Sequence, residues 1–160
     1  LPMTFPYTTG QIPIYYNRRN PARRGTQGWY KDIQIEPMYE FGYGLSYSTF
    51  EYSPVTLSSD SVAKDGKVTA SVTVRNTSDV DGMETVQWYI CDPVCSITRP
   101  VKELKHFEKV LLKAGESKTF TFEIEPYRDL SFVDRTGERF LDSGEYHIIV
   151  KDSKVVLNVE

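Results

Sequence analysis

Histidine and cysteine are scarce in this chain, which has two residues of each type among its 160. His106 and His147 lie far apart and neither has a partner at zinc-ligand spacing, so we expect both near the surface and predict no metal site. No Gly-x-Ser-x-Gly segment is present, which removes the turn that presents a nucleophilic serine in α/β-hydrolases. Metal-dependent and serine-dependent catalysis are therefore not predicted.

Long apolar runs are also lacking. No stretch approaches the roughly 20 residues that a membrane-spanning helix needs. Residues 1–4 have neither the charged region nor the apolar region of a signal peptide. The sequence therefore predicts no membrane partner, and because it opens with Leu1 we expect a processed chain or a piece of a larger protein.

Positive charge is not in excess, since 19 Lys and Arg residues stand against 22 Asp and Glu residues and the formal net charge is -3. Nucleic-acid binding draws most of its affinity from a basic face that neutralises phosphates, so no nucleic-acid partner is predicted. The hydrophobic fraction of 39% and the charged fraction of 26% are those of a globular protein. A length of 160 residues suits one domain with an added arm.

The first 47 residues show neither a helical nor a strand period for long. A structureless run of this length is unusual inside a compact domain, so we predict an extended arm over residues 1–47 that lies on another surface. Prolines and glycines punctuate it: Pro2, Pro6, Gly10, Pro13, Pro21, Gly25, Gly28, Pro37, Gly42 and Gly44.

Aromatic and basic side chains are interleaved in this arm. Tyr, Trp and Arg are the residue types that dominate protein interfaces, so the cluster predicts docking on a partner domain. A solvated loop with aromatic anchors and a ring stacked on a sugar are the two alternatives. The cluster comprises Tyr15, Tyr16, Arg18, Arg19, Arg23, Arg24, Trp29, Tyr30 and Lys31.

From residue 48 the pattern changes to short strands. Apolar and polar residues alternate over 67–76, 84–92 and 119–125, which predicts half-buried antiparallel strands. Residues 146–150 and 155–159 predict a terminal hairpin across a turn at Asp152-Ser153. The predicted core consists of Val68, Val72, Val74, Val86, Trp88, Ile90, Phe120, Phe122, Ile124, Tyr146, Ile148 and Val150.

Turn residues separate these strands at regular intervals, at 63–66, 79–82, 113–116, 135–138 and 142–145. About seven short strands with such turns, and no amphipathic helix, indicate a two-sheet β-sandwich of the immunoglobulin-like type over residues 48–160. A closed barrel is the alternative architecture.

Cys91 and Cys95 enclose Asp92-Pro93-Val94. A disulfide at this spacing closes only if the Asp-Pro step turns the chain back sharply. In an oxidising compartment a local disulfide is one alternative, and two free thiols at a strand end are the other.

One segment, residues 39–50, reads Tyr-Glu-Phe-Gly-Tyr-Gly-Leu-Ser-Tyr-Ser-Thr-Phe. It resembles the F-G-Y-G-L-S-Y-T-x-F motif that opens the C-terminal fibronectin type III-like domain of family-three glycoside hydrolases, chiefly β-glucosidases and β-xylosidases. Residues 1–6 and 11–17 resemble the family's L-P-x-T-F-P and P-x-Y-Y-N runs. Further matches in order are 74–77, 81–82, 98–104, Phe107 and 115–117, so the resemblance spans nearly the whole chain.

The resemblance implies a fibronectin type III-like β-sandwich whose arm comes from a missing catalytic α/β domain. In such enzymes the catalytic Asp and Glu belong to other domains, so it implies no catalytic residue and no cofactor in this chain. It implies the catalytic domains of the same polypeptide as partners, and a periplasmic or secreted location. The candidate interdomain contacts are Tyr15, Tyr16, Arg18, Arg19, Trp29, Tyr30, Phe41 and Tyr43.

The motif also suggests how the arm is attached. Gly42 and Gly44 would let the backbone turn where a Cβ clashes, and we expect Phe41, Tyr43 and Leu45 to pin the arm to the first strand.

Catalysis by this chain alone is not expected, although carboxylates are plentiful. A glycosidase needs two of them at a fixed separation across a cleft. Six of the 22 fall in predicted turns, where solvated turn-forming is the ordinary role: Asp79, Asp81, Asp134, Glu138, Asp142 and Glu145.

Three functions are thus weighed. The first is a non-catalytic accessory domain that packs on and stabilises a glycosidase. The second is an independent carbohydrate-binding or adhesive β-sandwich, for which a carbohydrate is the partner. The third is an enzyme in its own right. Affinity electrophoresis on soluble glucans together with an aryl glycoside assay separates them.

Overall fold

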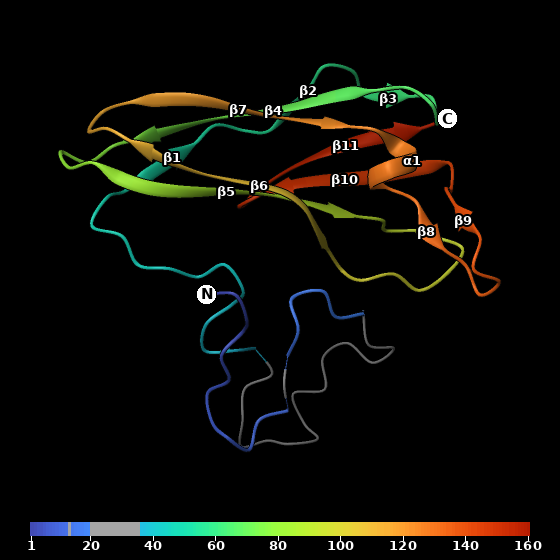
Figure 1. The fold of residues 1–160 in the computed structure, drawn as a ribbon, viewed down its shortest axis with the longest axis horizontal. Coiled ribbons are helices and arrows are strands. Elements are labelled where there is room, and N and C mark those ends of the chain that lie inside the picture. The colour runs from blue at the N-terminus through green and yellow to red at the C-terminus, as the bar shows by residue number, and fades with distance from the viewer. Residues whose placement is uncertain (13, 20–35) are drawn as a thin grey trace.

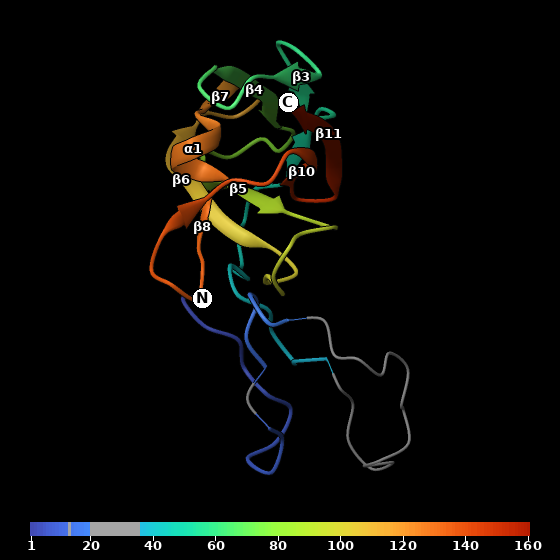
Figure 2. The same cartoon turned by 90° about the vertical axis from the view of Figure 1, so that its right-hand side faces the viewer.

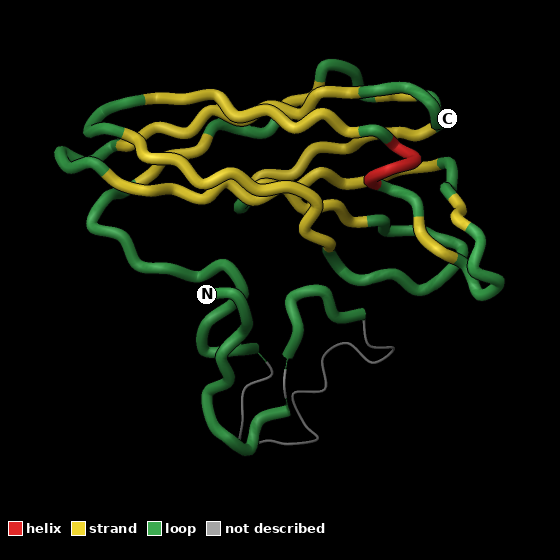
Figure 3. The backbone as a smooth tube through the Cα atoms, viewed as in Figure 1, coloured by secondary structure: helices red, strands yellow, loops and turns green. Residues whose placement is uncertain are grey.

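The computed structural model describes residues 1–12, 14–19 and 36–160, and shows two stacked β-sheets (Figure 1). The strands run lengthwise through the stack and the turns lie at its two ends (Figure 3). The predicted two-sheet β-sandwich is confirmed, and the barrel alternative is wrong, because the strands pair within two separate sheets.

The four-stranded sheet is centred on β4, whose alternating valines bury one face and leave threonine and serine on the other. β7 pairs with one edge of β4, while β1 and β2 share its other edge, all antiparallel. The bounds of these strands are Phe50–Tyr52 for β1, Thr56–Leu57 for β2, Val68–Asn76 for β4 and Ser117–Ile124 for β7.

The five-stranded sheet has the order β3-β11-β10-β5-β6, in which only β3 pairs in parallel, with β11. β2 and β3 follow each other in the sequence but belong to different sheets, so residues 58–60 cross between the layers. The bounds are Ser61–Val62 for β3, Gly82–Cys91 for β5, Glu103–Leu112 for β6, Gly144–Val150 for β10 and Ser153–Val159 for β11.

The hydrophobic core lies between the two sheets. Every residue predicted for it is buried, and Trp88 is 0% exposed. The alternation therefore identified the correct face of β4, β5, β7 and β10. Leu112, Leu130, Leu141 and Leu157 complete the core from positions that the prediction did not include.

β6 is a strand that the sequence analysis missed. Glu103, Lys105, Glu108 and Lys109 obscure its alternation. β6 is an edge strand that pairs only with β5, and charged side chains on an edge discourage pairing with other chains. The charged residues that obscure the alternation of β6 therefore suit a strand at the edge of the sheet. The β5–β6 register shifts between Trp88 and Tyr89.

One further prediction needs correction. The terminal hairpin is confirmed, but Val150 pairs with Ser153, so its turn is Lys151-Asp152 and not Asp152-Ser153. Lys151 takes the positive φ of 52° that this tight turn requires. No amphipathic helix was expected, and the described residues contain one helical turn, α1 (Pro126–Asp129), followed by the small hairpin of β8 (Phe132–Val133) and β9 (Arg139–Phe140).

Arg99 anchors the loop that joins β5 to β6. Its buried guanidinium donates to the Leu130 carbonyl oxygen at 2.6 Å and pairs with Asp92 at 3.3 Å and Glu103 at 2.8 Å. Breaking a buried ion pair is strongly destabilising because it leaves a charge uncompensated. This loop therefore offers a fixed edge, which the arm contacts at Pro100.

The described arm segments lie beside the five-stranded sheet, on the side away from the four-stranded sheet (Figure 1). Figure 2 shows them extending from the sandwich. Among the residues described, these segments contain turns and isolated β-bridges, and none of the bridges extends into a strand. The division into an arm over 1–47 and a sandwich over 48–160 stays a prediction.

Candidate interdomain surface

Three aromatic rings join the arm to the five-stranded sheet. Tyr16 stacks on Phe41 with 4.4 Å between ring centroids, which brings two distant arm segments together. Tyr16 also meets the ring of Tyr89, on the outer side of β5, edge-on at 6.1 Å. Aromatic pairs in these geometries contribute about 0.5–1.5 kcal/mol beyond their buried area. This trio is therefore the main apolar attachment of the described arm.

Tyr89 is the sheet's side of this attachment and is only 7% exposed. The Lys102 ammonium lies 4.9 Å from the centre of its ring, and its hydroxyl donates to Gln87 Oε1 at 3.2 Å. Burial, assisted by Tyr16 and Glu40, raises the pKa of Tyr89 to about 12. The phenol therefore stays neutral at physiological pH and acts as a packing and hydrogen-bonding group.

Gly42 brings the arm backbone close to the same sheet. Its φ is +84°, and a Cβ at this position would lie 2.6 Å from Gln87 Oε1. Its N–H donates to the Leu1 carbonyl oxygen at 2.9 Å, and the Leu1 ammonium donates to the Tyr43 carbonyl oxygen at 2.6 Å. The positive φ favours a glycine here, whereas the conflict with a Cβ involves only the end of the flexible Gln87 side chain, which can move aside.

The predicted hinge and pin are only partly correct. Gly44 has nothing within 4 Å of a built Cβ and no left-handed φ, so the hinge argument holds for Gly42 alone. Phe41 packs on Tyr16 and not on β1, and Leu45 is 90% exposed. The contacts of the described arm are therefore with β5 and with the loop between β5 and β6.

Backbone hydrogen bonds fix the course of the arm. Phe5 and Tyr39 form an antiparallel bridge, with 2.8 Å from the Phe5 nitrogen to the Tyr39 oxygen. Val101 N–H donates to the Arg18 carbonyl oxygen at 2.8 Å, beside a bridge between Arg19 and Pro100. The Arg18–Glu36 ion pair at 3.5 Å is solvent-exposed and so adds little stability.

An open pocket of about 590 Å³ lies within the arm. Apolar and aromatic side chains dominate its walls. The lining residues are Pro2, Met3, Thr4, Pro6, Ile14, Tyr15, Tyr16, Asn17, Pro37 and Phe41.

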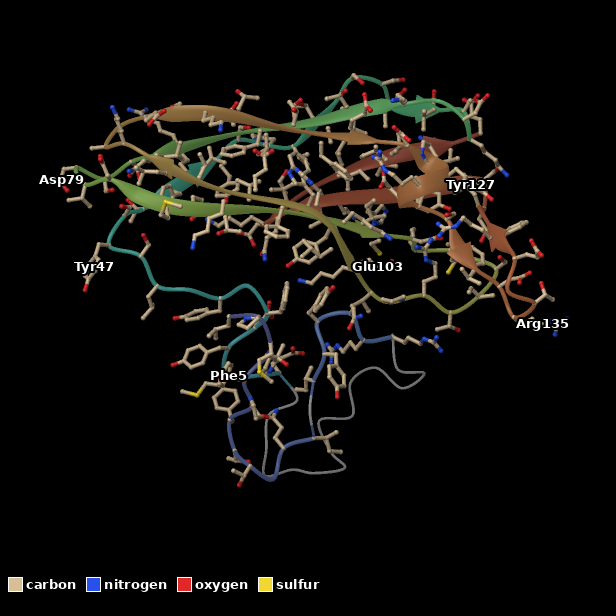
Figure 4. All side chains as sticks on the ribbon, viewed as in Figure 1. Phe5, Tyr47, Asp79, Glu103, Tyr127 and Arg135 are labelled. Carbon is tan, nitrogen blue, oxygen red and sulfur yellow. The ribbon has the colours of Figure 1, made fainter. Side chains whose placement is uncertain are left out.

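Large apolar side chains are exposed along the arm and the neighbouring edge of the sheet. Tyr47 is fully exposed, at 101%, and points away from the sandwich in Figure 4. We call the following set the apolar face: Leu1, Met3, Phe5, Tyr7, Ile12, Tyr15, Met38, Tyr43, Leu45 and Tyr47 of the arm, with Met83 of β5 and Phe107 and Leu111 of β6.

The outer side of the four-stranded sheet has the opposite character. Thr69, Ser71 and Thr73 of β4 alternate with its buried residues and so line this side. On β7 the exposed Thr119 and Thr121 continue it, and the hydroxyls of Thr73 and Thr119 are 2.9 Å apart. Short hydroxyl side chains are well solvated, so this side suits contact with water. The two outer sides of the sandwich are therefore chemically unequal.

Six of the eight residues that were predicted as interdomain contacts lie in the described part of the chain. The structure brings Tyr16 and Phe41 together on β5, places Arg18 and Arg19 beside Pro100, and leaves Tyr15 and Tyr43 exposed. The remaining two lie outside the described residues: Trp29 and Tyr30, as do Arg23, Arg24 and Lys31 of the same cluster.

Sequence reasoning missed Tyr89 and its neighbours Gln87 and Lys102. A signal was available, because Val86, Trp88 and Ile90 point inward and Tyr89 is thus an aromatic residue on the supposedly wet side of its strand. An aromatic at an outward position indicates that something covers it.

Both cysteines are free thiols in this structure. Burial raises the pKa of Cys91 and of Cys95, and the Cys95 thiol donates to the Ile97 carbonyl oxygen at 2.6 Å. The structure thus has the free-thiol alternative, and a disulfide under oxidising conditions stays a prediction.

The charged groups of the described residues show structural roles. Asp134 accepts from Thr136 N–H and its hydroxyl, both at 2.7 Å, as a turn-forming carboxylate does. The His147 ring lies 2.6 Å from Glu145, and His106 stacks on Phe122 with centroids 5.2 Å apart. Within the described ranges, no three His, Cys, Asp or Glu side chains form a metal-binding group, and no helix is long and apolar enough to cross a bilayer.

A comparison with known protein families finds a match over the strands described above. The profile of the fibronectin type III-like domain family matches residues 84–154. Residues 84–154 belong to a fibronectin type III-like domain. The chain is 43% identical over 157 residues to a periplasmic beta-glucosidase of Salmonella typhimurium, covering 94% of this chain and 20% of that protein. A beta-xylosidase of Formosa agariphila is 37% identical over 150 residues, covering 94% of this chain and 21% of that protein.

A solved structure agrees. A beta-glucosidase from Listeria innocua, in complex with glucose, superposes with a TM-score of 0.89 and 40% identity, covering 99% of this chain and 24% of that chain. The chain spans about a fifth of the length of the curated relatives it matches. It corresponds to the C-terminal fibronectin type III-like region of family-three glycoside hydrolases, and the catalytic domains of those enzymes are not within these 160 residues.

Proposed function

We propose that the fibronectin type III-like domain is a non-catalytic accessory domain of a glycosidase acting on β-glucosides or related glycosides. It packs on the catalytic domains of the same polypeptide and stabilises them. The names of the relatives support the parent activity, and a periplasmic relative supports a periplasmic or secreted location. The observation that carries the docking role is the contrast between the apolar face and the hydroxyl-bearing outer side of the other sheet.

The exposed apolar side chains indicate how docking would stabilise a complex. Burying one large apolar side chain contributes about 1.5–3 kcal/mol, and a few central anchors carry most of the energy of an interface. Leu45 and Tyr47 meet that description, since both are almost fully exposed and lie in one segment beside Met83. We therefore assign them as the anchors of the apolar face.

The test compares one pair of substitutions in two contexts. Leu45→Asp and Tyr47→Asp are introduced into the 160-residue chain and into a longer polypeptide that carries the catalytic domains. In the chain alone we expect changes in unfolding free energy within about 0.5 kcal/mol, because both side chains face solvent. In the longer polypeptide we expect a lower melting temperature and faster proteolytic release of the fibronectin type III-like domain.

Thr121→Asp is the matched control, because it adds the same charge at an exposed position on the outer side of the four-stranded sheet. It should leave the longer polypeptide unchanged. Equal effects of the control and anchor substitutions would refute the assignment of the docking side, and no effect from any of the three would refute docking through these residues.

The second part of the proposal places catalysis outside this chain. We expect the isolated chain to hydrolyse no aryl β-glucoside or β-xyloside above the buffer background, and to show no retardation by neutral glucans in affinity electrophoresis. Turnover that survives purification and is lost on mutation of one of the chain's own carboxylates would overturn this part. Retardation without turnover would favour a carbohydrate-binding module.

A further inference from the structure

A pocket of about 400 Å³ lies at the α1 end of the sandwich, remote from the arm. Figure 4 shows Tyr127 at this end and Phe5 in the arm. The turn after β3, the helix α1 and the strand β9 form the pocket. Its lining residues are Lys64, Asp65, Gly66, Lys67, Glu125, Tyr127, Arg128 and Arg139.

Two of the four cations in this pocket are neutralised by carboxylates. The Lys67 ammonium lies 2.9 Å from Glu123 and 3.0 Å from Glu125. Arg128 pairs with Glu125 at 3.2 Å and with Asp129 at 2.9 Å. These ion pairs neutralise Lys67 and Arg128, so the two cations offer little net charge to a ligand.

The other two cations have no carboxylate partner among the residues described. The Lys64 ammonium donates to the Leu141 carbonyl oxygen at 3.0 Å, and Arg139 Nη1 donates to the Ser131 hydroxyl at 2.9 Å. Both acceptors are neutral, so neither Lys64 nor Arg139 is held in an ion pair, and Asp65 is the one lining carboxylate without an ion-pair partner among the residues described.

Arg139 is also held in position. Ser131 is buried, and its hydroxyl donates to the backbone carbonyl of Tyr127 while it accepts from Arg139. One buried hydroxyl thus ties the guanidinium to the residue whose aromatic ring is 54% exposed at the same pocket. The planar guanidinium has five N–H donors, and its fork matches a carboxylate. Most of these donors remain available.

We propose that this pocket binds a carboxylated pyranose, such as a hexuronic acid residue, with its carboxylate on Arg139 and Lys64 and its ring against Tyr127. A cation hydrogen-bonded to Ser131, in the same pocket as an exposed aromatic residue, matches a ligand that joins an anion to a flat, partly apolar ring face. The choice of a sugar as the ligand rests on the proposed glycosidase function. The charge and geometry of the pocket are observations that do not depend on that function.

The experiment is a nuclear magnetic resonance titration of the isotope-labelled chain. The probes are xylotriose that carries a glucuronic acid substituent, unsubstituted xylotriose, and sodium acetate. We expect the substituted probe alone to shift the amides of Tyr127, Arg139 and residues 64–67. Arg139→Gln should weaken its binding about ten-fold, as expected for the loss of a charge-assisted bidentate contact.

Arg75→Gln is the matched control, because it removes one positive charge at the opposite end of β4 from Lys67 and should leave the affinity unchanged. Equal weakening by both variants would show that only net charge matters and would overturn the proposal. Equal shifts with acetate would show general anion binding, and equal shifts with xylotriose would show that the acid is not recognised; either also overturns it. The arm is not involved, so docking through the apolar face stands or fails separately.

Discussion

Truncation of Trp88 probes the core of the sandwich most directly. The side chain is 0% exposed and meets Phe122 of the opposite sheet at 6.1 Å between ring centroids. Trp→Ala in a core costs about 3–5 kcal/mol. The indole Nε1 has no hydrogen-bond partner among the described residues, and a buried unsatisfied donor costs about 1–3 kcal/mol. Since alanine removes that penalty too, we expect a loss near the lower limit, about 3 kcal/mol.

Trp88→Phe separates the two contributions, because it keeps an aromatic ring and removes the unsatisfied N–H. We expect it to cost about 1–2 kcal/mol, less than Trp88→Ala, because the smaller ring leaves a smaller cavity. The measurement is urea unfolding followed by circular dichroism, with Tyr47→Ala as the exposed aromatic control, for which we expect a change within about 0.5 kcal/mol.

Two outcomes would refute this reasoning. A loss below about 1 kcal/mol for Trp88→Ala would mean that the ring is not a central part of the core. Equal losses for Trp88→Phe and Trp88→Ala would mean that the indole N–H contributes a favourable interaction, and the unsatisfied donor would be the wrong interpretation.

Three further predictions concern the backbone, pH and protection. Gly82→Ala should cost about 1–3 kcal/mol in urea unfolding, because its Cβ would lie 2.2 Å from Ser48 Oγ, whereas Gly44→Ala should be neutral. Although burial opposes it, Lys105 and Arg99 lower the pKa of Glu103, so its stabilisation is full above the unfolded pKa of about 4.3 and is lost as pH falls through the folded value. Glu103→Gln should therefore flatten the acid limb of stability between about pH 5 and pH 3, and an unchanged limb would contradict the linkage. Amides before Met38 should exchange faster than those of residues 68–74 in hydrogen exchange, and equal protection would make the arm an integral part of the fold.

The apolar alternation of β4, β5, β7 and β10 was readable from the sequence because a strand's period is local. Each strand buries every second side chain, so Val68, Val86 and Phe120 mark their face within a few residues. β6 was not readable in this way, because an edge strand accepts charges such as Glu103 and Lys105 that break the period. Position within the sheet, and not local preference, decides that tolerance.

The candidate interdomain surface could be predicted only in part from the sequence. The arm's aromatic residues were recognised as interface types, and Tyr16 and Phe41 do meet. Tyr89, the residue of β5 that Tyr16 contacts, is 73 positions from Tyr16 in the sequence, and nothing local links the two. The pairing of Arg139 with Ser131 beside Tyr127 likewise depends on how β9 returns towards α1.

By itself, the sequence determined the β-sandwich, the identity of its core and the glycine at position 42, because alternation and backbone sterics act between near neighbours. Only the tertiary structure decided which outer side carries the arm, which residues contact it and which cations lie together in the pocket at the α1 end. Those properties arise between segments far apart in the chain. Their contacts form only when the two sheets and the loops at their ends are assembled.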